Sequence, residues 1–165
     1  MTTSPGFRPV WSEIDLDAVR ANIRALRATV APARVLAVVK ADAYGHGAVP
    51  VARAVLEAGA EWLGVALVEE GVALRDAGVN APILVLSEPA PSAAAAVVAR
   101  GLTPVVYTTH GIDALAKAVA DAGRVEPLGV HLKVDTGMHR VGCRPDDAPA
   151  LVAAIPEARE TVERR

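Results

Sequence analysis

Apolar residues along this chain fall into short runs of the length and composition expected of buried β-strands. Five such runs, rich in Val, Leu and Ile, are separated by stretches in which apolar residues recur at helical spacing. Near-continuous apolar strands with helical crossovers indicate a parallel sheet that is covered on both faces. The predicted strands are residues 35–39, 62–67, 82–86, 103–107 and 128–134.

The beginning of the chain has a different pattern. Residues 10–16 (VWSEIDL) alternate apolar and polar side chains, which predicts a short strand. Apolar residues then recur every three or four positions, which predicts a helix that Asp15 or Asp17 could cap. The predicted apolar face of this helix consists of Leu16, Val19, Ile23, Leu26 and Val30.

Glycine and proline mark the boundaries of the later helices. Gly59, Gly78, Gly101 and Gly123 each fall between a helical stretch and the next strand, where a residue in the left-handed conformation commonly ends a helix. Pro50 suits the first turn of another helix. These glycine and proline positions at the helix boundaries therefore support a repeated βα architecture.

This repeat predicts an α/β fold, either a doubly wound sheet or a (β/α) barrel. A closed barrel takes eight strands and about 250 residues, which is more than the five strands of this repeat provide. Residues 148–155 begin one more helix, after which residues 156–165 (PEARETVERR) become abruptly charged.

Composition restricts the class of protein and of partner. Hydrophobic residues make up 52% of the 165 residues but aromatics only 3%, so Ala, Val and Leu must fill the core. A net charge of −2 provides neither a nucleic-acid-binding surface nor a polybasic membrane surface. Cys143 is the only cysteine, which excludes an internal disulfide and a cysteine-based zinc site. No stretch approaches the ~20 apolar residues of a membrane helix, so we expect a cytoplasmic protein. We also expect a small-molecule partner and no metal.

Lysine is scarce in this chain, with three lysines against fourteen arginines. Lys40 and Lys133 each end a predicted strand, and both should lie at the C-terminal edge of the sheet, where α/β folds place their active sites. An amine at the mouth of a barrel is partly desolvated, which favours the neutral form that attacks an aldehyde to give a Schiff base. The alternative for either lysine is a side chain that extends from the strand end into water.

The residues after Lys40 form a glycine-containing loop, ADAYGHG at 41–47. Its glycines allow a tight turn, and the following helix should begin with free N–H groups that could approach an anion. Tyr44 could donate its hydroxyl to a phosphate or could instead pack over the barrel rim. His46 is better interpreted as a loop-packing residue than as a ligand.

A second group of polar residues follows the fifth predicted strand, in KVDTGMHRVG at 133–142. The planar guanidinium of Arg140 could fix an anionic or phenolate oxygen. The alternative is an ordinary surface ion pair between Asp135 and Arg140 with little energetic consequence.

Together, AVVKADAYGHG at 37–47 and HLKVDTGMHRVG at 131–142 resemble the two N-terminal signatures of the alanine racemases, a family of fold-type III pyridoxal-phosphate enzymes. WSEIDLDAVRANI near the start and APILVL at 81–86 resemble the same family in the same order. The resemblance covers nearly the whole chain up to about Ile155. It implies an incomplete (β/α)8 TIM-type barrel with about five of the eight βα units. The predicted organisation is then an N-terminal strand segment, residues 1–16, and a truncated barrel domain, residues 17–165. The resemblance also implies pyridoxal 5'-phosphate as cofactor and interconversion of L-alanine and D-alanine, which supplies D-alanine to the peptidoglycan of the cell wall.

By this resemblance, Lys40 binds the cofactor aldehyde and, once the substrate has freed it, acts as the base on one face of the α-carbon. Tyr44 contacts the cofactor phosphate, and Arg140 lies near the cofactor phenolate and the substrate. Lys133 corresponds to a lysine that is often carbamylated in the family. A carbamate there would be an anion able to hold Arg140 in place.

The family also implies groups that this sequence does not contain. Its opposite-face base is a tyrosine on a C-terminal β-domain, supplied by the partner subunit of a homodimer. Tyr44 and Tyr107, the two tyrosines of the chain, lie in the lysine loop and at the end of the fourth predicted strand, so neither corresponds to it. We therefore expect the chain alone to be weakly active or inactive, with its first and fifth strands as unpaired edges.

Two other hypotheses remain open at this point. The chain could be a different fold-type III racemase or a small pyridoxal-phosphate-binding protein, although HLKVDTGMHRVG argues against the second of these. It could also be a non-functional truncated product, an interpretation that the charged last ten residues support.

Overall fold

The computed structural model describes residues 11–163, with side chains described as far as residue 155, and contains one parallel sheet. Its strands lie in the order β1-β2-β3-β4-β5, which is also their order in the chain. A doubly wound sheet reverses its strand order at a switch point, whereas a barrel adds strands sequentially. The order therefore confirms the partial barrel. The strands are β1 (Leu36–Val38), β2 (Trp62–Val65), β3 (Ile83–Val85), β4 (Thr103–Val106) and β5 (His131–Leu132).

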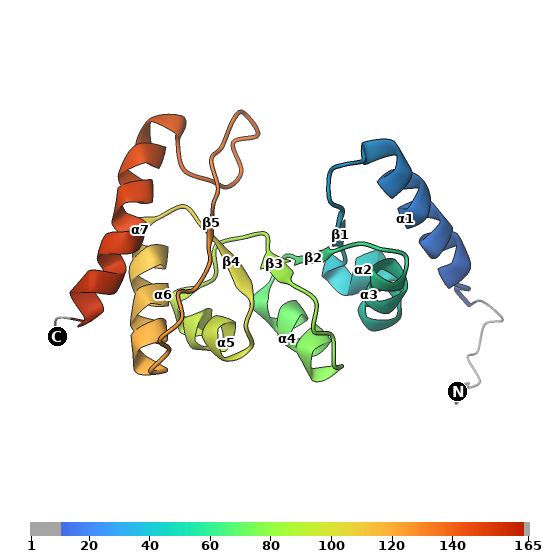
Figure 1. Ribbon diagram of the computed structural model, residues 1–165, viewed down its shortest axis with the longest axis horizontal. Coiled ribbons are helices and arrows are strands. Elements are labelled where there is room, and N and C mark those ends of the chain that lie inside the picture. Colours follow the sequence, from blue (N-terminus) through green and yellow to red (C-terminus); the bar gives the residue numbers. More distant parts are fainter. Residues whose placement is uncertain (1–10, 164–165) are drawn as a thin grey trace.

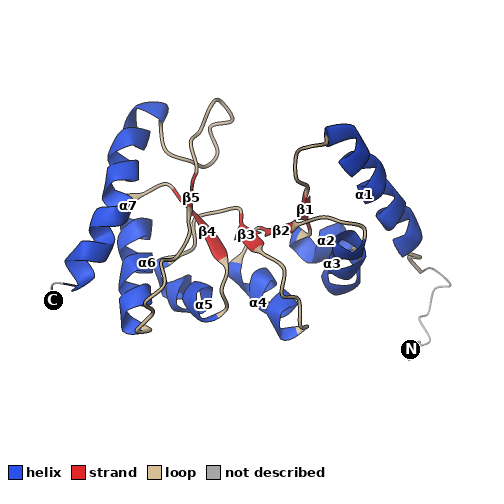
Figure 2. Cartoon of the chain, viewed as in Figure 1, coloured by secondary structure: helices blue, strands red, loops and turns tan. Residues whose placement is uncertain are grey.

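Helices connect the strands and line one side of the strand arc (Figures 1 and 2). The helices at the two ends pack on inner helices, α1 on α3 and α7 on α6. Within residues 11–163, no helix combines the length and the apolar character needed to cross a bilayer. The α-helices are α1 (Leu16–Val30), α2 (Lys40–Gly45), α3 (Ala48–Glu57), α4 (Val68–Asp76), α5 (Ala94–Ala99), α6 (Thr109–Asp121) and α7 (Ala148–Glu163); short 3-10 helices precede α5 (Pro91–Ala93) and α7 (Pro145–Asp147).

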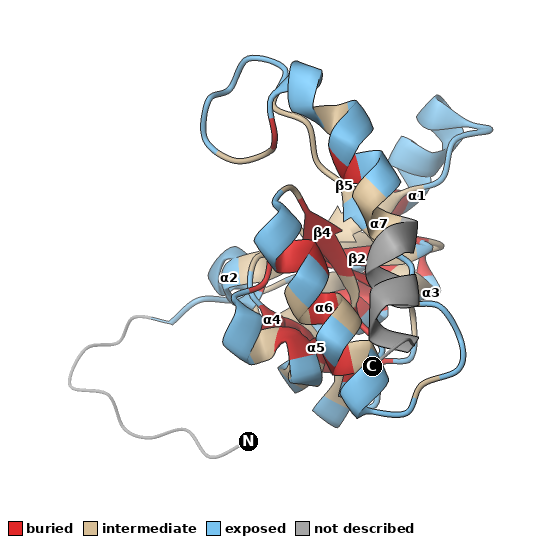
Figure 3. Cartoon of the chain, turned by 90° about the vertical axis from the view of Figure 1, so that its left-hand side faces the viewer, coloured by how far each residue is buried: buried red, intermediate tan, exposed pale blue. Residues whose placement is uncertain are grey.

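The two faces of the sheet differ in how well they are covered. The face toward the helices is closed, because Leu63, Ile83 and Val106 are fully buried there, and Figure 3 shows β4 in the colour of buried residues. On the opposite, inner face, His131 is exposed and Val38 retains 37% of its exposure. The core therefore lies between sheet and helices, while the inner face stays half open.

A ring contact across the inner face shows how strongly the sheet curves. The rings of Trp62 on β2 and His131 on β5 meet edge to face with centroids 6.0 Å apart. Two strands separate β2 from β5, so in a flat sheet their axes would lie about 14 Å apart at 4.7–4.9 Å per strand. The arc bends inward as a barrel wall does.

The structure corrects several predicted boundaries. No strand forms in residues 11–15, and α1 begins at Leu16 with the Asp15 carboxylate capping the N–H groups of Asp17 and Ala18. The alternating pattern had no neighbouring strand with which to pair; Val10 lies outside the described residues. The fifth predicted strand, 128–134, shortens to two residues because only these pair with β4.

The glycines predicted to end the helices are confirmed. Gly59, Gly78, Gly101 and Gly123 all adopt positive φ after α3, α4, α5 and α6. Only part of the predicted apolar face of α1 is buried, since Leu26 is 53% exposed. The main packing partner of α1 is α3. The C-terminal half of α1 extends beyond the core.

Candidate active site

Lys40 lies where the sequence predicts, directly after β1 at the C-terminal edge of the sheet. The preceding residue, Val39, is 2% exposed and its N–H donates to the carbonyl of Gly64 at 2.8 Å, which anchors the strand end. Lys40 itself is half-buried. Within the described part of the chain its amine has no hydrogen bond or ion pair. The amine is therefore available to react with a ligand.

The loop after Lys40 is a left-handed helical turn. Four consecutive residues, Ala41 to Tyr44, have φ between 50° and 56°, and the N–H of Ala43 donates to the carbonyl of Val39 at 2.9 Å. Left-handed helical geometry costs about 1–2 kcal/mol per L-residue, so the surrounding contacts must hold it. Strain of this kind is concentrated at functional sites.

Two carboxylates hold this turn. The Asp42 carboxylate accepts a hydrogen bond from the N–H of Ala48, the first residue of α3, at 2.6 Å. The prediction that this helix begins with free N–H groups is wrong for Ala48, because an internal anion already occupies that donor. The other carboxylate, that of Glu70 on α4, accepts from the Ala41 N–H. Glu70 was not identified from the sequence, since 29 residues separate the partners.

Tyr44 and His46 lie at the far end of the turn. Tyr44 is 61% exposed, which does not fit the alternative that it packs over the barrel rim. The Nδ1 atom of His46 lies 2.8 Å from the carbonyl oxygen of Ala43, as expected of a residue that packs its own loop. The hydroxyl of Tyr44 is thus free to meet a ligand beside Lys40.

Lys133 follows β5 and lies on the inner face of the sheet. Its ammonium donates to the carbonyl of Leu86, after β3, at 3.1 Å, so the side chain spans the intervening strand β4. Side chains of alternate strands meet in this way inside a barrel. Lys40 and Lys133 therefore lie at the C-terminal ends of the strands, as predicted, Lys40 after the first strand of the sheet and Lys133 after the last.

The loop after Lys133 does not form the predicted ion pair between Asp135 and Arg140. Asp135 instead accepts hydrogen bonds from the N–H groups of Gly137 and His139 at 3.0 and 3.1 Å. These donors, with Gly137 first, hold the pKa of the Asp135 carboxyl below its ordinary value. Arg140 is exposed, and in residues 11–163 it forms no ion pair and no hydrogen bond with Lys133. The chain brings the two residues to one loop without joining them.

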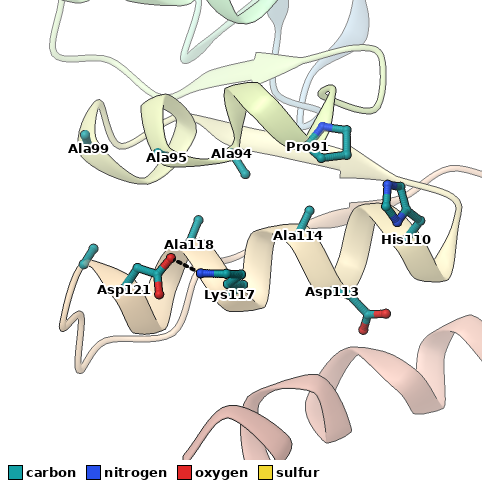
Figure 4. A pocket seen from close by; sticks show the side chains of 11 residues that line it. Pro91, Ala94, Ala95, Ala99, His110, Asp113, Ala114, Lys117, Ala118 and Asp121 are labelled. Atoms are coloured by element: carbon teal, nitrogen blue, oxygen red, sulfur yellow. Dashed lines mark hydrogen bonds and ion pairs between the residues drawn. The ribbon is translucent and has the colours of Figure 1, made fainter.

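A groove of about 710 Å³ lies elsewhere, between α5 and α6 on the helical side of the sheet (Figure 4). Alanines such as Ala94 and Ala118 make up much of its wall, and Lys117 pairs there with Asp121. None of the predicted site residues lines it. The chemistry of the lysine loop therefore has no connection with this groove.

Comparison with known proteins identifies the domain. The family model described as "Alanine racemase, N-terminal domain" matches residues 14–163. An alanine racemase of Symbiobacterium thermophilum is 53% identical over 146 residues, which cover 88% of this chain and 38% of that protein. The structure of an alanine racemase from Clostridium difficile 630 superposes with a TM-score of 0.83 at 33% identity, covering 93% of this chain and 40% of that one.

A solved structure of a protein named for another activity has the same fold. A histidine racemase from Leuconostoc mesenteroides subsp. sake superposes with a TM-score of 0.76 at 35% identity, covering 86% of this chain and 37% of that one. The chain thus spans about two fifths of the length of the relatives it matches. With the match to the family model over residues 14–163, these findings show that the chain belongs to the alanine racemase family, through its N-terminal domain.

Proposed function

We propose that this chain supplies the lysine-bearing half of a pyridoxal 5'-phosphate-dependent racemase that interconverts L-alanine and D-alanine. The observation that carries the proposal is the amine of Lys40, which is half-buried, without a partner in the described residues and held by a strained turn at the C-terminal edge of the sheet. The cytoplasmic location and homodimer that the family resemblance implies belong to the same proposal.

The residues present fit the cofactor at its aldehyde end. Lys40 offers a free amine, and the exposed hydroxyl of Tyr44, four residues along the turn, is free to donate to a phosphate oxygen. When bound, pyridoxal phosphate supplies electron withdrawal that acidifies the Cα–H of an attached amino acid. Among the described residues, Tyr44 is the one that the family resemblance assigns to the cofactor phosphate.

The site residues would share the work in this proposal. Lys40 would hold the cofactor by its aldehyde carbon, and its Nζ would accept the proton from one face of the substrate Cα. Arg140, exposed on the loop after Lys133, would bind the ring oxygen or the substrate carboxylate through its guanidinium. Lys133 borders the inner face, and a carbamate on its amine would be an anion able to pair with Arg140.

Racemisation needs a second proton-transfer group on the opposite face of Cα. Tyr107 follows β4 and Tyr44 belongs to the lysine loop, and by the family resemblance neither corresponds to the opposite-face tyrosine. For the 165 residues alone we therefore expect capture of the cofactor at Lys40 with weak or no racemisation.

The substrate is the least constrained part of the proposal. A relative 53% identical to this chain is named an alanine racemase, which favours alanine. A structural neighbour at 35% identity is named a histidine racemase, so histidine is the second candidate. Turnover of both amino acids should be assayed side by side.

The decisive experiment maps the lysine that reacts. The protein is mixed with pyridoxal phosphate, its visible absorbance is recorded, and the adduct is reduced with borohydride and located by mass spectrometry. We expect the label on Lys40 and its loss in Lys40→Arg, which retains the charge but cannot form the bond. Label on Lys117 or Lys133 instead would contradict the proposal, and no adduct at all would favour a non-functional product.

A second assay separates one-face proton transfer from full racemisation. In deuterated water, Lys40 alone should exchange the Cα proton of one alanine enantiomer for deuterium while leaving its configuration unchanged. Robust conversion of L-alanine to D-alanine by the 165 residues would refute the claim that the second proton-transfer group is missing.

A further inference from the structure

Two glutamates join neighbouring loops at the C-terminal edge of the sheet in the same manner. Glu88, after β3, accepts hydrogen bonds from the N–H groups of Tyr107 and Thr108, after β4, and from the Thr108 hydroxyl at 2.6 Å. Glu70, in the first turn of α4, reaches the N–H of Ala41, after β1, at 2.6 Å. Each carboxylate thus ties the ends of two adjacent strands, but only Glu70 contacts the lysine loop.

Glu70 uses both of its oxygens for this purpose. Oε1 accepts from Ala41, while Oε2 accepts from the N–H groups of Ala66 and Leu67 at 2.8 and 3.0 Å. Its negative charge also lies in the first turn of α4, at the positive end of the helix dipole, which stabilises this contact. The carboxylate therefore links the residue after Lys40 to the end of β2.

This contact holds the strained turn at its start. Ala41 is the first of four consecutive left-handed residues, and the opposite end of the turn is held by the Asp42 carboxylate on the N–H of Ala48. If the contact with Glu70 is removed, the peptide between Lys40 and Ala41 is free to rotate. That peptide sets the direction in which the Lys40 side chain leaves the backbone.

We propose that Glu70 is a positioning residue, which directs the Lys40 amine by fixing the peptide between residues 40 and 41. The inference rests on the proposed function for the role of Lys40 and adds a residue that touches neither cofactor nor substrate. A glutamine has one acceptor oxygen where glutamate has two. Glu70→Gln therefore preserves the size of the side chain and loses one side of the bridge.

Glu88→Gln provides the matched control, because it removes the same charge from the same edge of the sheet without touching the lysine loop. Hydrogen bonds to a charged acceptor contribute about 1.5–3 kcal/mol. We expect Glu70→Gln to weaken pyridoxal phosphate binding at Lys40 at least about tenfold, while Glu88→Gln stays within about twofold of the unsubstituted protein. Equal binding by the two variants would overturn the inference.

A second readout does not depend on the cofactor. With three lysines in the chain, reductive ¹³C-dimethylation gives few NMR signals, which Lys→Arg variants assign. We expect Glu70→Gln to shift or broaden the Lys40 signal and to leave that of Lys117 unchanged, whereas Glu88→Gln leaves the Lys40 signal in place. An unchanged Lys40 signal in Glu70→Gln refutes the positioning role even if the cofactor does not bind.

Failure of the proposed function is recognised separately, as absence of the Lys40 adduct in the unsubstituted protein. If Glu70→Gln does not fold, Glu70→Asp replaces it, since aspartate retains the charge but is one methylene too short to span both contacts. The same displaced Lys40 signal is expected from it, and a Lys40 signal identical to that of the unsubstituted protein counts against the inference.

Discussion

Arg75→Ala should lower the free energy of unfolding by about 2–4 kcal/mol, because this side chain ties together two loops at the edge of the sheet opposite the lysine loop. Nη1 of Arg75 donates to the carbonyls of Val79 and Ala81 at 2.7 and 2.8 Å. Nε and Nη2 donate to the carbonyls of Arg100 and Gly101 at 3.0 and 3.1 Å. One guanidinium thus satisfies four backbone acceptors from the α4–β3 and α5–β4 connections.

The magnitude follows from the burial of these four contacts. Hydrogen bonds from a charged donor contribute about 1.5–3 kcal/mol each when water is excluded. The two bonds made by Nη1 are partly buried, whereas those to Arg100 and Gly101 are exposed, so water can replace the second pair. Burial lowers the pKa of the Arg75 guanidinium, yet a guanidinium is basic enough that the group remains charged at neutral pH.

Urea unfolding followed by circular dichroism measures the effect. Arg53 is the matched control, because its guanidinium makes one exposed bond to the carbonyl of Ala77 at 2.8 Å, and Arg53→Ala should cost less than about 1 kcal/mol. Arg75→Lys should lose most of the stability that Arg75→Ala loses, since one ammonium cannot reach both loops. Equal midpoints for Arg75→Ala and Arg53→Ala would refute the reasoning.

Three further outcomes follow from the backbone and from one titrating group. Ala41→Gly should raise the unfolding free energy by up to about 1 kcal/mol, because glycine relieves the left-handed strain at an exposed position; a lower urea midpoint would contradict this. The Asp135 pKa lies below its ordinary 3.8, so its bonds to Gly137 and His139 contribute above that pH and are lost as the pH falls through the lowered value. NMR titration should show both amides shifting together with a midpoint below 3.8, and a midpoint at or above it would count against the hydrogen bonds. Gly64→Ala would place its Cβ 2.8 Å from Leu36, so we expect a loss of about 1 kcal/mol in the same urea assay; no loss would mean that the inner face is looser than described.

Much of the fold could be predicted because each strand carries its own signal. The apolar runs at 82–86 and 103–107 contain all of β3 and β4, and the glycines after the helices adopt the left-handed conformation that their positions predict. The strand predicted for residues 10–16 does not form over the described residues 11–15. Alternation of apolar and polar side chains indicates only that one face of the segment could be buried, whereas a strand also needs a neighbouring strand with which to form hydrogen bonds. Nothing in the local pattern says whether that neighbour exists.

Some features of the candidate site could likewise be predicted from the sequence and others could not. The placement of Lys40 and Lys133 at one edge of the sheet follows from their position after apolar runs in a parallel sheet. The left-handed turn after Lys40 could not be predicted, since the alanines of this segment have no preference for positive φ. Glu70 was missed for another reason: its partner Ala41 is distant in sequence, and only the adjacency of β1 and β2 brings the two together.

The environments of the three lysines explain why one of them should be the reactive amine. Lys117 is exposed on α6 and pairs with Asp121, so its amine must leave this partner before it can attack a carbonyl carbon. Lys133 donates to the carbonyl of Leu86, a contact that it must also give up before such an attack. Lys40 has neither kind of partner in the described residues, and the residue that follows it is held by a carboxylate. In the proposed function, we therefore expect the reactivity of Lys40 to depend on the contact between Ala41 and Glu70 as well as on its own position, and the Glu70 variants test that dependence.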